Sequence, residues 1–507
     1  MRHVRRLGTW VTAAILLGVG STVSVGAQSP LVEAVKAVDT SAVRSLLQKR
    51  ADVNVAEPDG STALYWAAEK NHVEIAQLLI RAGANPSART RYGATPLAMA
   101  SLNGNAALIE LLLKAGADFN TVTANNETVL MIAARTGVAA AVKTLLSHGA
   151  DPNAREDHRG QSALMWAATE GHVEVVRALI VAGADVIARS RQGWTALLFA
   201  ARDGRMEVVR ALVDAGANAN DSLDRPSGGG RGGGAGRADG PGGPARGASA
   251  LSLAIGSLHY ELAAYLLERG ADPNAANEGW TVLHQITWVR KPSQVANAGP
   301  AGSGNMDSLE LVKRLAAHGA DLNARMTRRG QTGTTDLNMI GATPLLMAAR
   351  TADAPLMRLL ATLGADPMLV NEDRTTVLMA AAGVGTHAPT EDAGIEVEAI
   401  EAVRVAVELL RNDVNAVNND GDTAMHGAAY KQFPSVVRYL AEHGADPAVW
   451  NRRNKLGWTP LRIAVGVYRG MHLRGSVPTA EAVREVLVAK GLSTEVESDA
   501  VLNSPYQ

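Results

Sequence analysis

Twelve histidines are the first side chains of this 507-residue chain whose chemistry has to be considered. Imidazole nitrogens are common zinc ligands, and a zinc site needs three or four ligands at characteristic spacings, such as His-Glu-x-x-His on a helix. No pair of histidines has such a spacing, and the chain has no cysteine to supply thiolates. His158, His387 and His472 fall in separate segments that are expected to be loops. The sequence therefore predicts no metal and no cofactor.

Arrangements that would support catalysis or nucleic-acid binding are also missing. There is no Gly-x-Ser-x-Gly elbow and no kinase signature, and many carboxylates lie in Gly-Ala-Asp turns, where they can bind the local backbone. The glycine-rich segment 222–246 carries Arg231, Arg237 and Arg246, but no aromatic side chains that could stack on bases. The formal net charge is −1, which creates no field for polyanions. We expect no enzyme and no nucleic-acid partner.

Residues 1–27 differ from the rest of the chain. Arg2, Arg5 and Arg6 precede an apolar run from Trp10 to Val19, and the small residues Val25-Gly26-Ala27 follow. This order is typical of a cleavable secretory signal peptide, and the run is shorter than the ~20 residues that span a membrane. We expect an exported protein, periplasmic or extracellular, with no membrane insertion after cleavage. The style of the signal and the lack of cysteine favour a bacterial source.

A pattern of the form Gly-x-Thr/Ser-x-Leu recurs along the chain. Its opening residues are Gly60, Gly93, Asn126, Gly160, Gly193, Gly247, Gly279, Gly341, Arg374, Gly421 and Gly457. Their gaps are 32 to 36 residues, apart from gaps of 47, 54 and 62 that indicate insertions. The threonine can cap a helix, and Pro96, Pro344 and Pro460 stand at the first helical position, which tolerates proline. A second helix with one apolar face follows and ends at a glycine, such as Gly83.

Two of these segments, TPLAMASLNGNAALIELLLKAGADFN and SALMWAATEGHVEVVRALIVAGADV, resemble ankyrin repeats. The resemblance extends from Gln28 to about Leu492, and Ser29-Pro30-Leu31 looks like the start of one further copy. It implies an all-α solenoid of about twelve helix-turn-helix units with hairpin-like finger loops. The expected divisions are 1–27 signal peptide, 28–221 regular repeats, 222–246 flexible insertion, 247–492 repeats with inserted loops, and 493–507 tail. Further insertions are expected at 289–305, 326–340, 383–396 and 467–477.

Eight histidines recur at fixed places within the repeat. His72, His172 and His259 lie twelve residues after an opening residue, His284 and His426 lie five after one, and His148, His318 and His443 precede a Gly-Ala-Asp turn. A residue type that recurs in register is explained more simply by packing and hydrogen bonding of the repeat than by metal binding. We therefore expect these histidines to be structural.

The resemblance implies a protein partner bound on the concave face, which ankyrin proteins build from finger tips and first helices. The position after the opening residue varies widely, so the scaffold does not dictate it, and it holds Trp194, Trp280 and Trp458. Tryptophan is enriched at binding hot spots, although packing between fingers is an equal alternative. Six further residues are expected in exposed slots: Arg91, Tyr92, Arg202, Asp203, Tyr430 and Lys431. We expect the chain itself to be monomeric.

Two other functions remain open. An exported effector or inhibitor could use the same scaffold against a host or competitor protein, and release from the producing cell would distinguish it from a retained scaffold. An enzyme or carbohydrate-binding protein could instead use the inserted loops. That function would need His387 and His472 to meet carboxylates in one pocket.

The exported chain should begin at Gln28, because Ala27 ends the small-residue cleavage signature and the first helix cap follows it directly. The intact mass of the exported protein measures this. A mature protein that still carries residues 1–27 would contradict the expected export.

Overall fold

The computed structural model describes residues 29–120, 123, 125–223, 247–276, 279–291, 304–328, 337–386, 394–411, 413–468 and 472–496. The expected signal peptide, residues 224–246 of the glycine-rich insertion and residues 497–507 of the tail lie outside them. Contacts between residues divide the chain into two parts, 1–124 and 125–507. We call their described residues the N-terminal stack and the C-terminal stack. The domain boundaries expected from the sequence stay a prediction.

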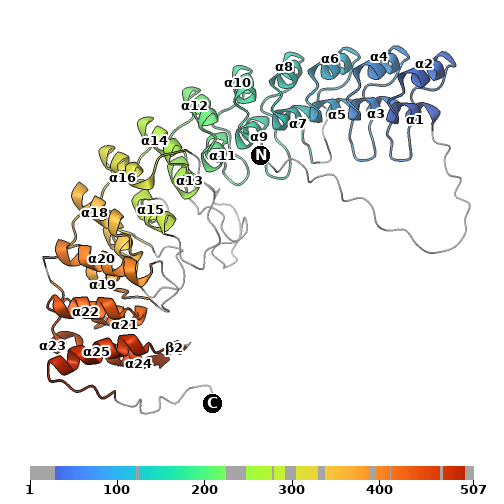
Figure 1. Cartoon of the computed structure of the whole chain (residues 1–507). Helices are drawn as coiled ribbons and strands as arrows, with labels where there is room; N and C mark the ends of the chain where they lie inside the picture. The colour runs from blue at the N-terminus through green and yellow to red at the C-terminus, as the bar shows by residue number, and fades with distance from the viewer. Residues whose placement is uncertain are drawn as a thin grey trace, which may run out of the picture. The chain divides into compact units, whose positions relative to one another are not determined.

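Both stacks are built from consecutive pairs of short antiparallel helices (Figure 1). The N-terminal stack holds α1 (Pro30–Lys36), α2 (Thr40–Gln48), α3 (Ala63–Glu69), α4 (Val73–Arg81), α5 (Pro96–Leu102) and α6 (Ala106–Lys114). The C-terminal stack begins with α7 (Val129–Thr136), α8 (Ala139–Ser147), α9 (Ala163–Glu170), α10 (Val173–Val181), α11 (Ala196–Arg202), α12 (Met206–Asp214), α13 (Ala250–Gly256) and α14 (Tyr260–Glu268).

The second half of the C-terminal stack is less regular. It holds α15 (Val282–Arg290), α16 (Ser308–Ala317), α17 (Pro344–Arg350), α18 (Ala354–Leu363), α19 (Val377–Ala382), α20 (Glu396–Leu409), α21 (Ala424–Lys431), α22 (Pro434–Glu442), α23 (Pro447–Trp450), α24 (Pro460–Val465) and α25 (Val477–Ala489). A two-stranded antiparallel hairpin, β1 (Gly466–Tyr468) and β2 (His472–Arg474), pairs Val467 with Leu473 between the last two helices.

The predicted caps set the ends of these helices. The Thr343 hydroxyl accepts a hydrogen bond from the Leu346 amide (3.2 Å), and Pro344 occupies the first helical position of α17. At the other end of the pair, Gly364 has φ +109° and Ala365 N–H donates back to Leu360 O (2.9 Å). Glycine adopts this left-handed conformation more readily than other residues. The turn that it makes lets backbone N–H groups bond to carbonyl groups that the last helical turn leaves without a partner.

The core of each stack runs along the repeats. First helices pack on first helices, as α7, α9 and α11 do, and second helices pack on second helices. Small side chains such as Ala167 and Ala168 let the first helices approach, while Leu164 and Leu179 fill the space between the two layers. Each helix pair therefore completes its apolar core only through its neighbours, which is the general property of repeat stacks.

An asparagine after the turn ties one repeat to the next. Asn153 Nδ2 donates to Gly183 O (3.0 Å), and its Oδ1 accepts from Asp185 N–H (2.8 Å). The same pair of bonds runs from Asn54, Asn220, Asn274 and Asn415 to the next turn. Asn415 keeps it although its own repeat lacks the Gly-Ala-Asp turn. The spacing between turns is thus held by hydrogen bonds from asparagine side chains to the backbone of the next turn, and not only by apolar contact.

The predicted helical fold is confirmed, including the extra first copy, α1 with α2. Two features were not predicted. Segment 447–450 forms α23, which places Trp450 in the core with its indole N–H donated to Ala445 O (3.3 Å). The insertion expected at 467–477 contains the β1–β2 hairpin.

Histidine at the repeat's twelfth position packs on the glycine that ends the preceding first helix. A Cβ added at Gly204 would lie 2.5 Å from the His259 ring, and φ there is +68°. We expect Gly204→Ala to lower the free energy of unfolding by about 2–3 kcal/mol, because backbone strain and steric overlap add. Thermal or urea unfolding measures this.

Gly216→Ala is the matched control, since Gly216 also has positive φ (+99°) but nothing lies within 4 Å of an added Cβ. It should cost about 1 kcal/mol, the backbone part alone. Equal losses in the two variants would show that the contact with His259 adds nothing.

Candidate functional site

The finger tips and the exposed sides of the first helices form what we call the finger surface. Within the C-terminal stack, Trp194 lies on it but is only 6% exposed. Its ring stacks on Phe199 (centroids 4.8 Å apart, 17° between planes), and the Arg202 guanidinium lies over it at 5.0 Å. Trp194 is therefore buried and does not project from the surface as expected, because Phe199 and Arg202 of its own first helix both pack against its ring.

Trp280 and Trp458 are half-buried. Trp280 meets Trp288 of α15 edge to face, with centroids 5.5 Å apart. The Trp458 amide donates to Asn454 Oδ1 (3.1 Å) at the base of its finger. The three tryptophans thus differ in environment although they share one repeat position. Contact with a partner stays a prediction for all three.

The predicted pairs of charged and aromatic residues also differ. In the N-terminal stack, Arg91 is exposed and lies over the 66% exposed Tyr92 ring (4.8 Å), and it donates to the Tyr92 hydroxyl (2.7 Å). In the C-terminal stack, Arg202 forms a bidentate ion pair with Asp203, with both bonds 2.8 Å. Arg91 and Tyr92 are exposed, whereas Arg202 and Asp203 are only half-exposed.

Tyr430 and Lys431 are buried, with 4% and 5% of their surface exposed. The expectation that they are exposed is therefore wrong. The chain after α19 packs against α21 here: a Cβ added at Gly383 would lie 2.3 Å from Lys431 Cγ. A residue of the regular repeat would be exposed at these positions. The additional segment that leads into the insertion covers them instead.

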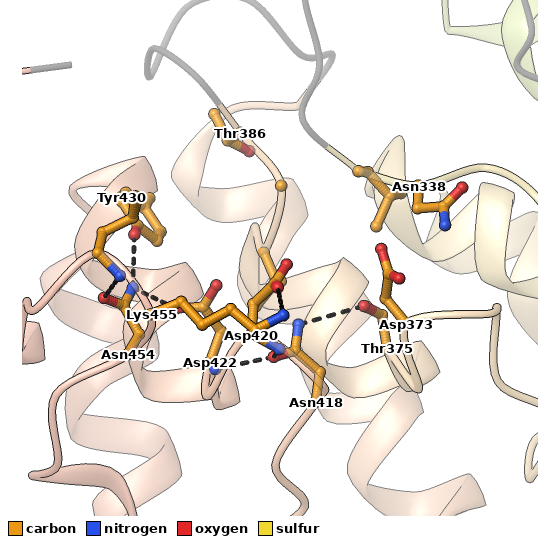
Figure 2. A pocket seen from close by; sticks show the side chains of 14 residues that line it. Asn338, Asp373, Thr375, Thr386, Asn418, Asp420, Asp422, Tyr430, Asn454 and Lys455 are labelled. Atoms are coloured by element: carbon orange, nitrogen blue, oxygen red, sulfur yellow. Dashed lines mark hydrogen bonds and ion pairs between the residues drawn. The ribbon is translucent and has the colours of Figure 1, made fainter.

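A polar hollow of about 210 Å³ lies where four successive fingers meet the ends of α19 and α21 (Figure 2). We call it the finger hollow. Its walls are Leu337, Asn338, Asp373, Thr375, Val384, Gly385, Thr386, Asn418, Asp420, Asp422, Tyr430, Asn454, Lys455 and Leu456.

Hydrogen bonds fix the polar side chains around the finger hollow. Asn454 Nδ2 donates to Asp422 Oδ1 (2.8 Å) and to the Tyr430 hydroxyl (3.0 Å), as Figure 2 shows. One finger along, Asn418 Nδ2 donates to Thr375 Oγ1 (3.4 Å). Asn418, Asn454 and Thr375 are buried. These groups are held before any partner arrives, so little conformational entropy is lost when they bind.

Carboxylates outnumber cations at the finger hollow. Asp373, Asp420 and Asp422 line it, and Lys455 is the one basic side chain among the lining residues. Lys455 Nζ lies 2.7 Å from Asp420 Oδ1, and this hydrogen bond, with the fields of Asp420 and Asp373, raises the Lys455 pKa above its usual value. The hollow favours hydrogen-bond donors and positive charge in a ligand.

The histidines in register hydrogen-bond within the scaffold, as predicted. His284 Nδ1 accepts from the Thr281 amide (3.3 Å), and its Nε2 donates to Ala342 O (3.0 Å). His426 makes the same bonds with Thr423 and Arg452 O. Both rings are fully buried, and burial lowers each pKa to about 4. In the described part of the chain, no group of three or more histidine and acidic residues could hold a metal ion.

A model of the family described as ankyrin repeats (3 copies) matches residues 31–123, 100–190, 130–223, 184–277 and 397–471, together more than half of the chain. The chain belongs to the ankyrin-repeat family. The finger hollow therefore lies on the surface formed by fingers and first helices of ankyrin repeats, and this family fold implies interaction with another protein.

The chain is also similar to parts of other proteins. The chain is 32% identical over 188 residues to a mitochondrial disaggregase of Bos taurus, 36% of this chain and 23% of that one. It is 30% identical over 179 residues to a mitochondrial disaggregase of Homo sapiens, which is 31% of this chain and 23% of that one. It is 28% identical over 141 residues to alpha-latroinsectotoxin-Lt1a of Latrodectus tredecimguttatus, which is 28% of this chain and 8% of that one. The matches span less than a quarter of each relative.

Sequence reasoning missed several residues of the finger surface. Trp166 and Phe199 each lie six residues after an opening residue of an ankyrin repeat, and Arg135 and Arg202 stack on their rings. Comparing that sixth position between repeats would have found the aromatic rings. Of the two histidines that the enzyme or carbohydrate-binding alternative needs, His387 lies outside the described residues and the His472 side chain is not described.

The two buried histidines predict a loss of stability in mild acid. Their folded pKa of about 4 lies below the usual 6.5, so between these values only the unfolded chain takes up the protons, and unfolding is favoured as pH falls. At pH 5 the loss relative to pH 7 should be about 2 kcal/mol for each histidine. Urea unfolding at both pH values measures it.

Replacing both with glutamine, in H284Q/H426Q, should lower stability at pH 7 but reduce the difference between pH 7 and pH 5. An unchanged pH dependence in this variant would assign the effect to other groups.

Proposed function

We propose that this ankyrin-repeat chain is an exported protein-binding scaffold and that its partner binds at the finger hollow. The observation that carries the proposal is the convergence of four consecutive fingers on one hollow with fixed polar walls. Regular repeats spread their variable residues along a surface, whereas here side chains from residues 337–456 act on one small volume.

The chemistry of the finger hollow supports an extended or turn-like segment of a protein. The Asp422 carboxylate, which Asn454 holds in place, and the Asp373 carboxylate beside it are acceptors that suit backbone N–H groups and basic side chains. Apolar edges are supplied by Leu337, Val384 and the 44% exposed Leu456. Such a mixture of a few oriented polar groups with apolar edges is usual for recognition sites.

Export is part of the proposal and rests on the sequence of residues 1–27. A charged start, a short apolar run and small residues before Gln28 support a cleaved signal, with the mature chain in the periplasm or outside the cell. In the described residues no helix is long and apolar enough to cross a membrane. We propose further that the repeats only bind the partner and catalyse no reaction on it.

Charge reversal at the edge of the finger hollow tests the function. Asp373 is half-exposed, and its side chain makes no hydrogen bond within the described structure, so Asp373→Arg should fold normally. Mature chain used as bait should capture a partner, and the purified pair should bind at least about tenfold more weakly with Asp373→Arg, a change of ~1.4 kcal/mol. Titration calorimetry gives both affinities.

The matched control is Glu174→Arg on α10, an exposed carboxylate on a second helix that pairs with Arg177. It should leave the affinity unchanged. Equal affinities of Asp373→Arg and the unmodified chain would place the binding surface elsewhere.

A further inference from the structure

Two repeats of this chain carry the same aromatic residue on the finger surface, and only one of them completes its polar contacts. Trp66 follows Gly60 by six residues, and Trp166 follows Gly160 by six. Above each ring lies a basic side chain from the last turn of the preceding first helix, Lys36 at 4.8 Å and Arg135 at 4.7 Å from the ring centroid. Each repeat thus builds a cation over an indole ring.

In the N-terminal stack a carboxylate completes this arrangement. Glu57, three residues before Gly60, accepts the Trp66 indole N–H at 2.6 Å and pairs with Lys36 Nζ at 2.5 Å. This hydrogen bond raises the Lys36 pKa, against the opposing effect of burial. Cation, indole and carboxylate therefore form a closed set of three groups.

In the C-terminal stack the corresponding carboxylate, that of Glu156, accepts no hydrogen bond from the indole N–H. The repeat before Gly160 is one residue longer than the usual 33, and Glu156 is buried at the base of the finger. Its oxygens accept the backbone N–H groups of His158 (2.6 Å), Arg159 (2.8 Å) and Gln161 (2.9 Å). Burial raises the Glu156 pKa, but these hydrogen bonds outweigh it and leave the pKa lowered. Glu156 is committed to its own finger.

The two donors at Trp166 are consequently left without an acceptor in the described structure. The Trp166 Nε1 atom is buried and makes no hydrogen bond, and no described carboxylate lies within ion-pair distance of the exposed Arg135 guanidinium. A buried donor with no acceptor costs about 1–3 kcal/mol, so most such groups in native proteins are satisfied by the protein, by water or by a ligand.

The backbone of Arg135 is held by the ring of His172. His172 Nε2 lies 3.1 Å from Arg135 O, and the same ring packs on Gly137 at the end of α7. The turn that joins α9 to α10, beside α7 (Figure 1), therefore holds the Arg135 backbone in place while its guanidinium stays at the surface.

We propose that Arg135 and Trp166 form an open site for a carboxylate side chain, aspartate or glutamate, of the partner protein. That carboxylate would take the place that Glu57 holds beside Trp66, accepting charge-assisted hydrogen bonds from the guanidinium and the indole N–H. The inference rests on the proposed function, since it names one chemical feature of the partner. It concerns a different group of repeats from the finger hollow.

The test uses the full chain labelled with ¹⁵N at the tryptophan indoles, which gives one N–H signal per ring in NMR. The Trp166 signal is the one that Trp166→Phe removes. The probes are the capped peptides acetyl-Gly-Glu-Gly-amide and acetyl-Gly-Gln-Gly-amide, with inorganic phosphate as a third ligand. The glutamate peptide should move the Trp166 signal in a saturable way, and Arg135→Gln should weaken its binding about tenfold or more.

The closed site supplies the matched control. The Trp66 signal should not respond to the glutamate peptide in the unmodified chain, but it should respond in Glu57→Ala, which opens that site. No response at Trp166, or equal responses to the glutamate and glutamine peptides, would overturn the proposal. A stronger response to phosphate would also overturn it in favour of a phosphorylated ligand.

An internal carboxylate is tested separately. Asp157 is the exposed acidic residue next to Glu156, and Asp157→Asn should leave the Trp166 signal in place. A shift as large as that caused by the glutamate peptide would show that Asp157 already fills the site, and the proposal would be wrong. Because these probes need no partner protein, a negative result leaves the Asp373→Arg test of the finger hollow unaffected.

Discussion

Stacking is the constraint on which the rest of this structure depends. A helix pair such as α9 with α10 has apolar sides toward both neighbours, so it is stable only between them. The asparagine bonds add a polar requirement, since Asn153 reaches both Gly183 O and Asp185 N–H of the next turn. Together these contacts repeat the same geometry in the regular repeats. Positions that take part in them must be filled in the same way, and positions outside them are free to vary.

That division explains why the histidines and the tryptophans behave differently. His284 and His426 join a threonine cap to a carbonyl of the following segment, so the fold determines both bonds. Trp194 and Trp280 occupy a position that the stack does not determine, and each takes its contacts from whatever its own first helix offers. Recurrence in register therefore marks scaffold, while variation marks the surface on which binding can evolve.

Most of the fold follows from the sequence because its determinants are local. The 33-residue spacing, threonine caps and terminal glycines predict the helix pairs, and His284 and His426 follow from their register. The burial of Tyr430 and Lys431 could not be predicted, because it comes from the segment after Gly383 that leaves the regular repeat. The finger hollow was missed for the same reason. It forms between fingers far apart in sequence, around bonds such as that of Asn454 to Tyr430.

The central claim is that partner binding is confined to the finger surface of the C-terminal stack. Hydrogen–deuterium exchange of the mature chain, with and without its purified partner, measures this directly. The account predicts slower exchange on binding in the fingers around residues 371–376, 418–423 and 454–458, and unchanged exchange in the second helices α18, α20 and α22. Protection confined to those second helices, with none in the fingers, would contradict it.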